Sequence, residues 1–138
     1  SVMQITNIKI QNFRNYENLD LDIGEGINVF LGSNAQGKTN LLEAIYITSI
    51  GKSFRTNRDS EMIGFNKEFS RVYAEIYKDE SESSVEIIID RKGKKFVKLD
   101  GVKIKKASEL LKNVYIVIFS PEDLRIVKEE TDNRAFNC

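Results

Sequence analysis

The sequence predicts a single α/β domain with an antiparallel β-meander, and three observations carry this prediction. A short apolar segment, residues 27–31, leads directly into a glycine-containing loop and then into a segment with helical spacing. Residues 72–104 alternate between apolar and polar positions and are interrupted by turn residues, which is typical of antiparallel strands. With 138 residues, of which 41% are hydrophobic and 30% charged, the chain has the composition and length of one globular domain.

Composition excludes several classes of site. The chain carries 21 Lys+Arg and 21 Asp+Glu, so it is formally neutral, and its only cysteine is Cys138. A single cysteine excludes a disulfide framework within the chain, and the absence of histidine together with this single cysteine excludes a Cys/His zinc site and a Ser-His-Asp triad. No apolar run approaches the roughly 20 residues that span a bilayer, and no signal-peptide pattern is present, so we expect a cytoplasmic protein.

The first part of the chain is predicted to form strands. Residues 1–2 precede Met3, which resembles a natural start, so we interpret them as a cloning remnant and place the domain from residue 3 onwards. An apolar pattern begins over residues 5–10, and residues 19–23 alternate between apolar side chains and aspartates, as in a half-buried strand. Residues 27–31 are almost continuously apolar, which predicts a strand covered on both faces.

A long helix and then a meander are predicted next. Apolar residues at helical spacing indicate a helix from Lys38 to about Ile50, with Gly51 at its C-cap, and residues 59–65 suit a short helix. Asp100 and Gly101 favour a two-residue type I′ turn between the last two strands of the meander. The predicted strands of the meander are residues 72–76, 85–90, 96–99 and 102–104.

The C-terminal part is expected to contain one more buried strand. Residues 107–112 are predicted to form a short helix, and residues 114–119 are another continuous apolar segment. Pro121 suits the first turn of a helix that would follow this strand.

The segment between the strand at residues 27–31 and the long helix carries the chemistry. It fits the Walker A pattern G-x-x-x-x-G-K-[ST] at every fixed position, and its neighbours are the strand and helix that this motif requires. Glycines let backbone N–H groups approach a phosphate, the lysine places a positive charge on the outer phosphates, and the threonine hydroxyl ligates Mg²⁺. We therefore predict a nucleoside triphosphate site with Thr39 as the Mg²⁺ ligand. The predicted phosphate-binding residues are Gly32, Ser33, Asn34, Ala35, Gln36, Gly37, Lys38 and Thr39.

Hydrolysis also requires a Walker B carboxylate at the end of a buried strand. Residues 87–90 have that outline, but turn residues flank them and two cations follow, so we interpret them as a decoy. Residues 116–119 are better placed, yet the acids Glu122 and Asp123 come two residues late. These two acids are the only catalytic candidates, and we expect the chain alone to be nearly inactive as an ATPase.

Four ordered motifs resemble those of the bacterial RecF family. They are residues 12–16 (Asn-Phe-Arg-Asn-Tyr), 32–45, 51–55 (Gly-Lys-Ser-Phe-Arg) and 119–124 (Phe-Ser-Pro-Glu-Asp-Leu). The resemblance runs from residue 3 to about residue 128, and we expect residues 129–138 to be an irregular tail. It implies a P-loop head of the ATP-binding-cassette (ABC) ATPase type, in its lobe I part, related to the heads of Rad50 and SMC proteins. Because RecF-like proteins are much longer, we expect an N-terminal part that lacks the signature and Walker B motifs.

The family resemblance also implies ligands and partners. These are ATP rather than GTP, Mg²⁺, and DNA at single-strand gaps, with RecO and RecR as partners in loading RecA and inducing the SOS response. The complete protein would be a weak, DNA-stimulated ATPase and an ATP-dependent homodimer. Asn40 and Arg14 would contact the nucleotide, although a solvated turn would also explain Arg14. Tyr16 could approach the nucleotide base, but a half-buried strand tyrosine with a solvated hydroxyl is commoner, so we leave it outside the site.

Glu122 and Asp123 would lie in the segment that related heads use as the Q-loop. An acidic first turn of a helix, which the helix dipole favours, explains them equally well.

Two groups of cations are candidates for DNA binding. Lys52, Arg55 and Arg58 suit the phosphates of either nucleotide or DNA, and a solvated connector explains them almost equally well. Residues 91–106 carry eight Lys/Arg and one acid, and Lys94 and Lys98 would share one strand face with an aromatic residue. For that face we favour an ordinary solvated hairpin over a DNA surface.

Two rival functions remain beside a RecF-type DNA repair protein. One is another SMC-like or Rad50-like head, for which long heptad repeats would follow, and this chain shows none. The other is a nucleotide-binding module without turnover.

Overall fold

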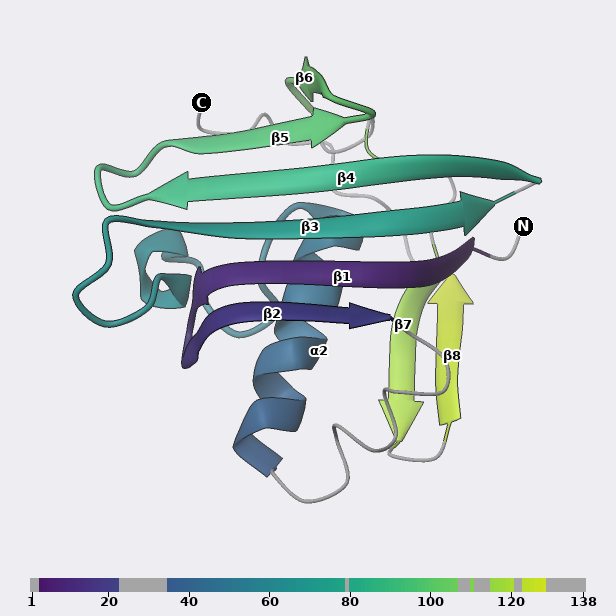
Figure 1. Cartoon of the computed structure of the whole chain (residues 1–138), viewed down its shortest axis with the longest axis horizontal. Coiled ribbons are helices and arrows are strands. Elements are labelled where there is room, and N and C mark those ends of the chain that lie inside the picture. The colour runs from purple at the N-terminus through teal and green to yellow at the C-terminus, as the bar shows by residue number, and fades with distance from the viewer. Residues whose placement is uncertain are drawn as a thin grey trace.

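The computed structural model describes residues 3–22, 35–78, 80–106, 110, 115–120 and 123–128. Within these residues, six strands form one antiparallel sheet in the order β2-β1-β3-β4-β5-β6, and β7 and β8 form a separate antiparallel pair (Figure 1). The elements are β1 (Met3–Phe13), β2 (Tyr16–Asp22), α2 (Ala35–Ile50), the 3-10 helix η1 (Asp59–Met62), β3 (Phe69–Lys78), β4 (Ser81–Asp90), β5 (Lys95–Leu99), β6 (Val102–Ile104), β7 (Tyr115–Ser120) and β8 (Asp123–Lys128).

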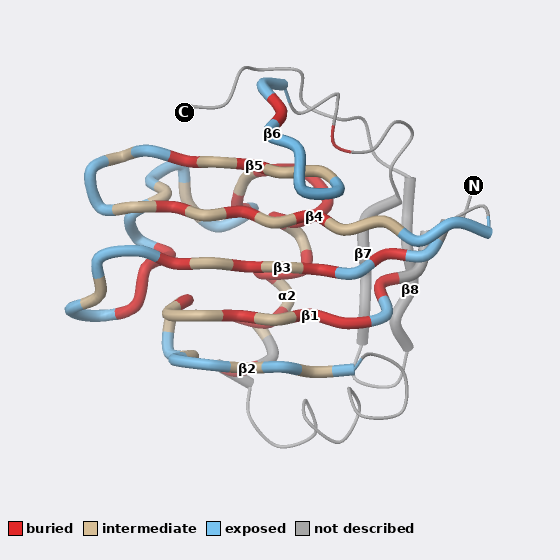
Figure 2. The backbone as a smooth tube through the Cα atoms, turned by 45° about the horizontal axis from the view of Figure 1, so that its top comes forward, coloured by how far each residue is buried: buried red, intermediate tan, exposed pale blue. Residues whose placement is uncertain are grey.

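The core lies between one face of the six-stranded sheet and α2. Alternate residues of β1, β3 and β4 are buried, such as Ile8, Ile76 and Ile87, and they pack with Leu41 and Ile45 of α2. Figure 2 shows that burial is concentrated in the central strands, whereas the edge strands β2 and β6 are mostly exposed or intermediate. The sheet therefore provides a rigid support for the helix that follows the phosphate loop.

Helix α2 confirms the predicted long helix but begins three residues earlier, at Ala35 inside the Walker A motif. Its end is as expected, because Gly51 has a φ of 93° and donates its N–H to the carbonyl of Ile47 at 2.8 Å. Such a left-handed cap favours glycine, since it has no side chain to clash. No helix of the described residues is long and apolar enough to cross a membrane.

The meander is confirmed, with longer first strands than the apolar pattern indicated. β3 and β4 extend over ten residues each, because polar residues such as Ser81 and Ser83 continue the ladder beyond the apolar positions. Asp100 and Gly101 have φ angles of 52° and 80°, the two positive values that a type I′ turn requires. At residues 59–65 the structure has only the short 3-10 helix η1.

The helix expected after Pro121 is wrong. The chain from Asp123 continues as β8, which pairs with β7 so that Ser120 lies opposite Asp123. The strand pairing satisfies the backbone groups that a helix would otherwise have satisfied. The predicted strand at residues 27–31, the tail at residues 129–138, and all of the predicted helix at residues 107–112 except Leu110 lie outside the described residues.

Candidate functional site

The candidate site is the N-terminal end of α2. Of the Walker A residues, Gly32, Ser33 and Asn34 lie outside the described residues, and Ala35 to Thr39 form the first turn of the helix. The first N–H groups of a helix have no acceptor within it and carry the positive end of its dipole. A helix that begins inside the motif therefore presents the kind of terminus that binds phosphate.

The turn between β1 and β2 lies against this end of α2 and is backbone-strained. Asn12 and Arg14 both adopt left-handed conformations, with φ of 53° and 52°, which non-glycine residues seldom do. Two backbone hydrogen bonds to residues 62–64 hold the turn. The Arg14 N–H donates to the Met62 carbonyl at 2.8 Å, and the Gly64 N–H donates to the Asn12 carbonyl at 2.7 Å. The last residue of η1 and the segment after it thus fix the position from which Arg14 projects.

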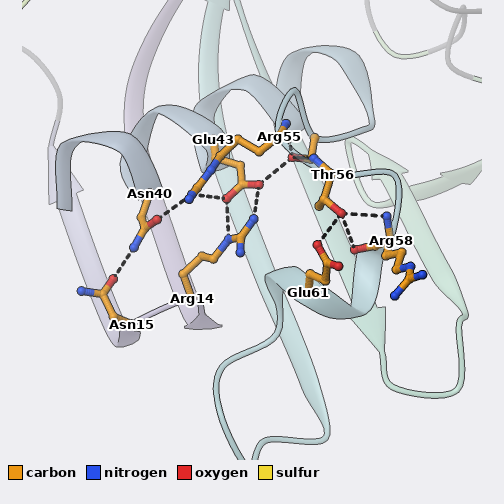
Figure 3. A network of polar contacts seen from close by, with 9 residues as sticks. Arg14, Asn15, Asn40, Glu43, Arg55, Thr56, Arg58 and Glu61 are labelled. Atoms are coloured by element: carbon orange, nitrogen blue, oxygen red, sulfur yellow. Dashed lines mark hydrogen bonds and ion pairs between the residues drawn. The ribbon is translucent and has the colours of Figure 1, made fainter. Parts of the chain in front are cut away.

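Glu43, one helical turn after Thr39, is the centre of a polar cluster (Figure 3). Its carboxylate is fully buried and accepts two hydrogen bonds from Arg14, from Nε at 2.7 Å and from Nη2 at 2.8 Å. The hydroxyl of Ser53 donates to it at 2.6 Å, and Nη1 of Arg55 at 3.2 Å. One carboxylate thus joins α2, the β1–β2 turn and the connector between α2 and η1, residues 51–58.

The ionisation of this cluster follows from those contacts. Burial alone would raise the pKa of Glu43, but hydrogen bonds from Arg14 and Ser53 and the charges of both arginines outweigh it, so this pKa is lowered. The hydrogen bond to Glu43 raises the pKa of Arg14 despite the opposing effect of burial. The Glu43 carboxylate is therefore ionised beside a charged Arg14 guanidinium.

Asn40 extends the cluster towards the start of the helix. This buried side chain donates from Nδ2 to Oδ1 of Asn15 at 2.7 Å, and its own Oδ1 accepts a hydrogen bond from Nη1 of Arg55 at 2.8 Å. Arg55 therefore bridges Asn40 and Glu43 on one side of α2.

Tyr16 is a contact that sequence reasoning missed. Its hydroxyl donates to the carbonyl of Gly37 at 2.8 Å, inside the Walker A motif, and burial raises the pKa of this tyrosine. The sequence signal was its place directly after the Asn-Phe-Arg-Asn motif, at the start of β2, where Tyr16 pairs with Phe13. The expectation of a tyrosine outside the site thus overlooked a direct link to the phosphate loop.

The predicted site residues fall into two groups. Arg14, Asn40 and Arg55 meet in the cluster around Glu43, and Thr39 lies half-buried in the first turn of α2. Arg58, by contrast, precedes η1 with its N–H donated to the Thr56 hydroxyl at 3.0 Å, and Lys52 directly follows the helix cap.

The other predicted cations lie on the meander. Lys98 is on the outer face of β5, where its Nζ lies 3.9 Å from the carboxylate of Glu86, which also pairs with Arg71. Lys94 precedes the strand, in a turn whose N–H groups at residues 92 and 94 bond to the Asp90 carboxylate at 2.9 and 3.0 Å. Asp90 therefore stabilises a turn of the meander.

The interpretation of Glu122 and Asp123 as an acidic first turn of a helix finds no support in the described residues. Glu122 lies outside the described residues, and Asp123 is the first residue of the strand β8.

Comparisons with known proteins show the family of the chain. A family model described as "AAA domain" matches residues 7–135. The chain is 45% identical over 132 residues to the DNA replication and repair protein RecF of Clostridium botulinum (strain ATCC 19397 / Type A), covering 96% of this chain and 36% of that protein. The RecF of Clostridium novyi (strain NT) is 48% identical over 132 residues, covering 96% and 37%. The chain thus spans about a third of the length of the curated relatives that it matches.

Solved structures give the same result for the fold. The structure of the recombination mediator protein RecF-ATP in the RecFOR pathway matches with a TM-score of 0.73 at 41% identity, covering 87% of this chain and 33% of that chain. A structure from work on ATP-driven dimerization and DNA stimulated activation of SMC ATPases matches with a TM-score of 0.63 at 22% identity, covering 78% and 75%. At that identity the SMC likeness concerns the fold alone. The chain therefore belongs to the AAA domain family, with the P-loop ABC-ATPase fold that RecF and SMC heads share, and it resembles the N-terminal region of RecF over nearly all of its residues.

Proposed function

We propose that this chain is the ATP-binding part of a RecF-type DNA repair ATPase and that it binds MgATP at the N-terminus of α2. The observation that carries the proposal is that the Walker A residues Ala35 to Thr39 form the first turn of a helix whose flank holds two charged arginines. A triphosphate carries several negative charges, and both the helix terminus and the guanidiniums would stabilise it.

Each residue has a defined task in this proposal. Gly32 to Gly37 wrap the phosphates with backbone N–H groups, Lys38 adds a positive charge, and the hydroxyl of Thr39 ligates Mg²⁺. Asn40 and Arg14 belong to the nucleotide site, from the two elements that meet at this end of the helix. The Tyr16 hydroxyl holds the Gly37 carbonyl, which orients the first turn of α2.

The wider role rests on likeness to RecF. In the complete protein, ATP would close a homodimer on DNA at single-strand gaps, and hydrolysis, weak and DNA-stimulated, would release it. RecO and RecR would act with it to load RecA and to induce the SOS response. Without a signature motif and a Walker B carboxylate, charge developing in the transition state is left uncompensated, so we expect this chain alone to turn over ATP very slowly.

Calorimetric titration of MgATP and MgGTP tests the nucleotide site, with phosphate release followed in parallel. We expect saturable MgATP binding to the wild-type protein, its loss in Lys38→Ala, and no appreciable turnover. Lys92→Ala, an exposed lysine in the turn of the meander, is the matched control and should bind as the wild type does. Unchanged binding in Lys38→Ala would overturn the assignment of the phosphate loop. Rapid phosphate release would contradict the expected inactivity of the chain.

For DNA we propose the connector cations Lys52 and Arg58 rather than the face with Lys94 and Lys98, since Arg55 is bound to Asn40 and Glu43 on the side of the nucleotide site. Glu86 lies next to Lys98 and lowers the net charge of that face, whereas the connector lies beside the nucleotide site. In a version extended to the length of the RecF relatives, Lys52→Ala with Arg58→Ala should flatten the salt dependence of DNA affinity, because fewer phosphates would be neutralised. A flatter salt dependence in Lys94→Ala with Lys98→Ala instead would reverse this assignment.

A further inference from the structure

We propose that Glu43 is a positioning residue for the nucleotide site: its buried carboxylate holds Arg14 and Arg55 beside the first turn of α2, where they favour binding of the triphosphate. This inference rests on the proposed function, since it concerns how the same site is prepared for its ligand.

The first argument is geometric. Glu43 follows Thr39 by four residues, so the two side chains lie on the same side of α2, one turn apart. The carboxylate accepts hydrogen bonds from the β1–β2 turn through Arg14 and from the connector through Ser53 and Arg55. It is the one described side chain in the cluster that contacts both arginines. Removing it would release two guanidiniums from two different elements.

The second argument is charge. A buried carboxylate is costly unless it is paired, and the bidentate Arg14 together with the Ser53 hydroxyl would already meet that need. Arg55 is a second cation on the same carboxylate, and it also donates to Asn40, the residue after Thr39. The cluster around Glu43 thus holds two guanidiniums against one carboxylate, with side chains only 20% and 28% exposed for Arg14 and Arg55.

Neighbouring charges do not remove this surplus. Glu61 raises the pKa of Arg14, but it is exposed and accepts a hydrogen bond from the Thr56 hydroxyl at 2.6 Å, so solvent screens its charge. Arg58, on the same side, adds a further positive charge at the surface. Positive charge held in partly buried positions is unfavourable by itself, and an anionic ligand would relieve it.

The third argument is the strain of the turn that presents Arg14. Two residues of this turn, Asn12 and Arg14, are left-handed, and such conformations persist where the surrounding structure enforces them. Here the carbonyl of Met62 and the N–H of Gly64 enforce it at the backbone, and Glu43 fixes the guanidinium. Because the Arg14 side chain is held at both its backbone and its guanidinium, it loses little conformational entropy when a ligand binds, which favours affinity.

The test uses Glu43→Gln, which keeps the size of the side chain and removes its charge. We expect the Kd for MgATP to rise roughly tenfold, because the guanidiniums are no longer held in place. Glu86→Gln is the matched control, since Glu86 also joins two cations, Arg71 and Lys98, but on the outer face of the sheet. Its Kd should equal that of the wild type. Glu43→Asp, which restores the charge on a shorter side chain, should recover part of the affinity.

A mutant cycle distinguishes the positioning of the two arginines by Glu43 from a purely structural role of this residue. In a background with Arg14→Ala and Arg55→Ala, Glu43→Gln should change the Kd by less than about twofold, since Glu43 has no guanidinium left to position. An undiminished effect in that background would overturn the inference. If Glu43→Gln fails to fold, Arg14→Lys and Arg55→Lys provide the test: unchanged Kd values in both would overturn it, and raised values would support it.

The failure of this inference differs from the failure of the proposed function. Binding by the wild type that is lost in Lys38→Ala but unchanged in Glu43→Gln would leave the nucleotide site intact and overturn the role of Glu43. Absence of MgATP binding in the wild type, in a version extended to the length of the RecF relatives as well, would overturn both.

Discussion

Two regions of the molecule bring a carboxylate together with two cations, and they differ in burial. In the middle of α2, the Glu43 side chain is fully buried between Arg14 and Arg55. On the outer face of the six-stranded sheet, the Glu86 side chain is 19% exposed and lies between Arg71 and Lys98, which are themselves 32% and 41% exposed. Ion pairs that solvent reaches contribute little to the free energy of unfolding. A buried carboxylate, by contrast, needs each of its partners to offset the cost of its burial.

The two regions also differ in what surrounds them. The cluster around Glu43 connects three elements, α2, the β1–β2 turn and the connector, one helical turn beyond the Walker A motif. The contacts of Glu86 stay within neighbouring strands of the sheet, where Lys103 and Phe96 also form a cation–π contact at 4.3 Å. The same residue types thus indicate a site in one place and an ordinary surface in the other.

The largest expected difference between the two regions concerns stability. Glu43→Ala should lower the free energy of unfolding by about 3–5 kcal/mol, because it leaves Arg14 and the Ser53 hydroxyl without their acceptor. Glu86→Ala should lower it by about 0–1 kcal/mol, since solvent compensates the loss. Urea unfolding followed by circular dichroism measures both values. Equal losses would show that the difference in burial has no energetic consequence.

Acid should weaken the buried region through Glu43. Its pKa is lowered in the folded state, so the unfolded chain takes up a proton more readily as the pH falls. The stabilisation is therefore fully present above the ordinary glutamate pKa and is lost as the pH falls through the folded value. We expect the difference in unfolding free energy between the wild type and Glu43→Gln to shrink at acid pH, because a protonated Glu43 resembles Gln. A difference that stays constant from neutral to acid pH would contradict this.

Much of the fold was predictable because it depends on local patterns. Alternation of apolar residues indicated β3 to β6, helical spacing indicated α2, and the Asp100-Gly101 pair indicated its turn type. The strand β8 was not predictable in this way, since the Ser-Pro-Glu-Asp segment also suits a helix start and pairing with β7 decides the outcome. Long-range pairing, such as β1 between β2 and β3, likewise leaves no short-range signal.

The candidate site was predictable only in part. The Walker A pattern indicated the phosphate loop, and the likeness to RecF pointed to Arg14 and Asn40. The partner of Arg14 was not foreseen, because Glu43 lies 29 residues away and a charged residue in an amphipathic helix is usually solvated. The sequence did contain a signal, however. Glu43 lies between the apolar residues Leu42 and Ala44, in a helix whose apolar residues are distributed over most of its circumference. A charged residue in such a helix has to find a partner.

Substitution of Gly64, which packs against the strained β1–β2 turn, should lower stability less than Glu43→Ala does. At Gly64, an added Cβ would lie 3.2 Å from the carbonyl oxygen of Arg14 and 3.3 Å from that of Asn12. Both are backbone atoms that cannot turn away, so Gly64→Ala should destabilise the protein by about 1–3 kcal/mol. Gly101→Ala is an informative comparison, since a Cβ there meets no atom within 4 Å and only its φ of +80° opposes the change. If Gly64→Ala displaces Arg14, it should also weaken MgATP binding, whereas Gly101→Ala should not.

The smallest effect expected is that of Tyr16→Phe, which removes one hydroxyl and keeps the ring. Loss of its hydrogen bond to the Gly37 carbonyl should cost about 0.5–1.5 kcal/mol of stability. Tyr73→Phe is the matched change on the outer face, where the ring lies 5.3 Å from Lys9 Nζ, and it should alter stability by less than about 0.5 kcal/mol. Thermal unfolding with and without MgATP separates two roles for Tyr16. Because the Gly37 carbonyl belongs to the phosphate loop, the stabilisation by MgATP should be smaller in Tyr16→Phe than in the wild type, and unchanged in Tyr73→Phe. An equal gain in both variants would mean that Tyr16 supports the fold of α2 without preparing its N-terminus for phosphate.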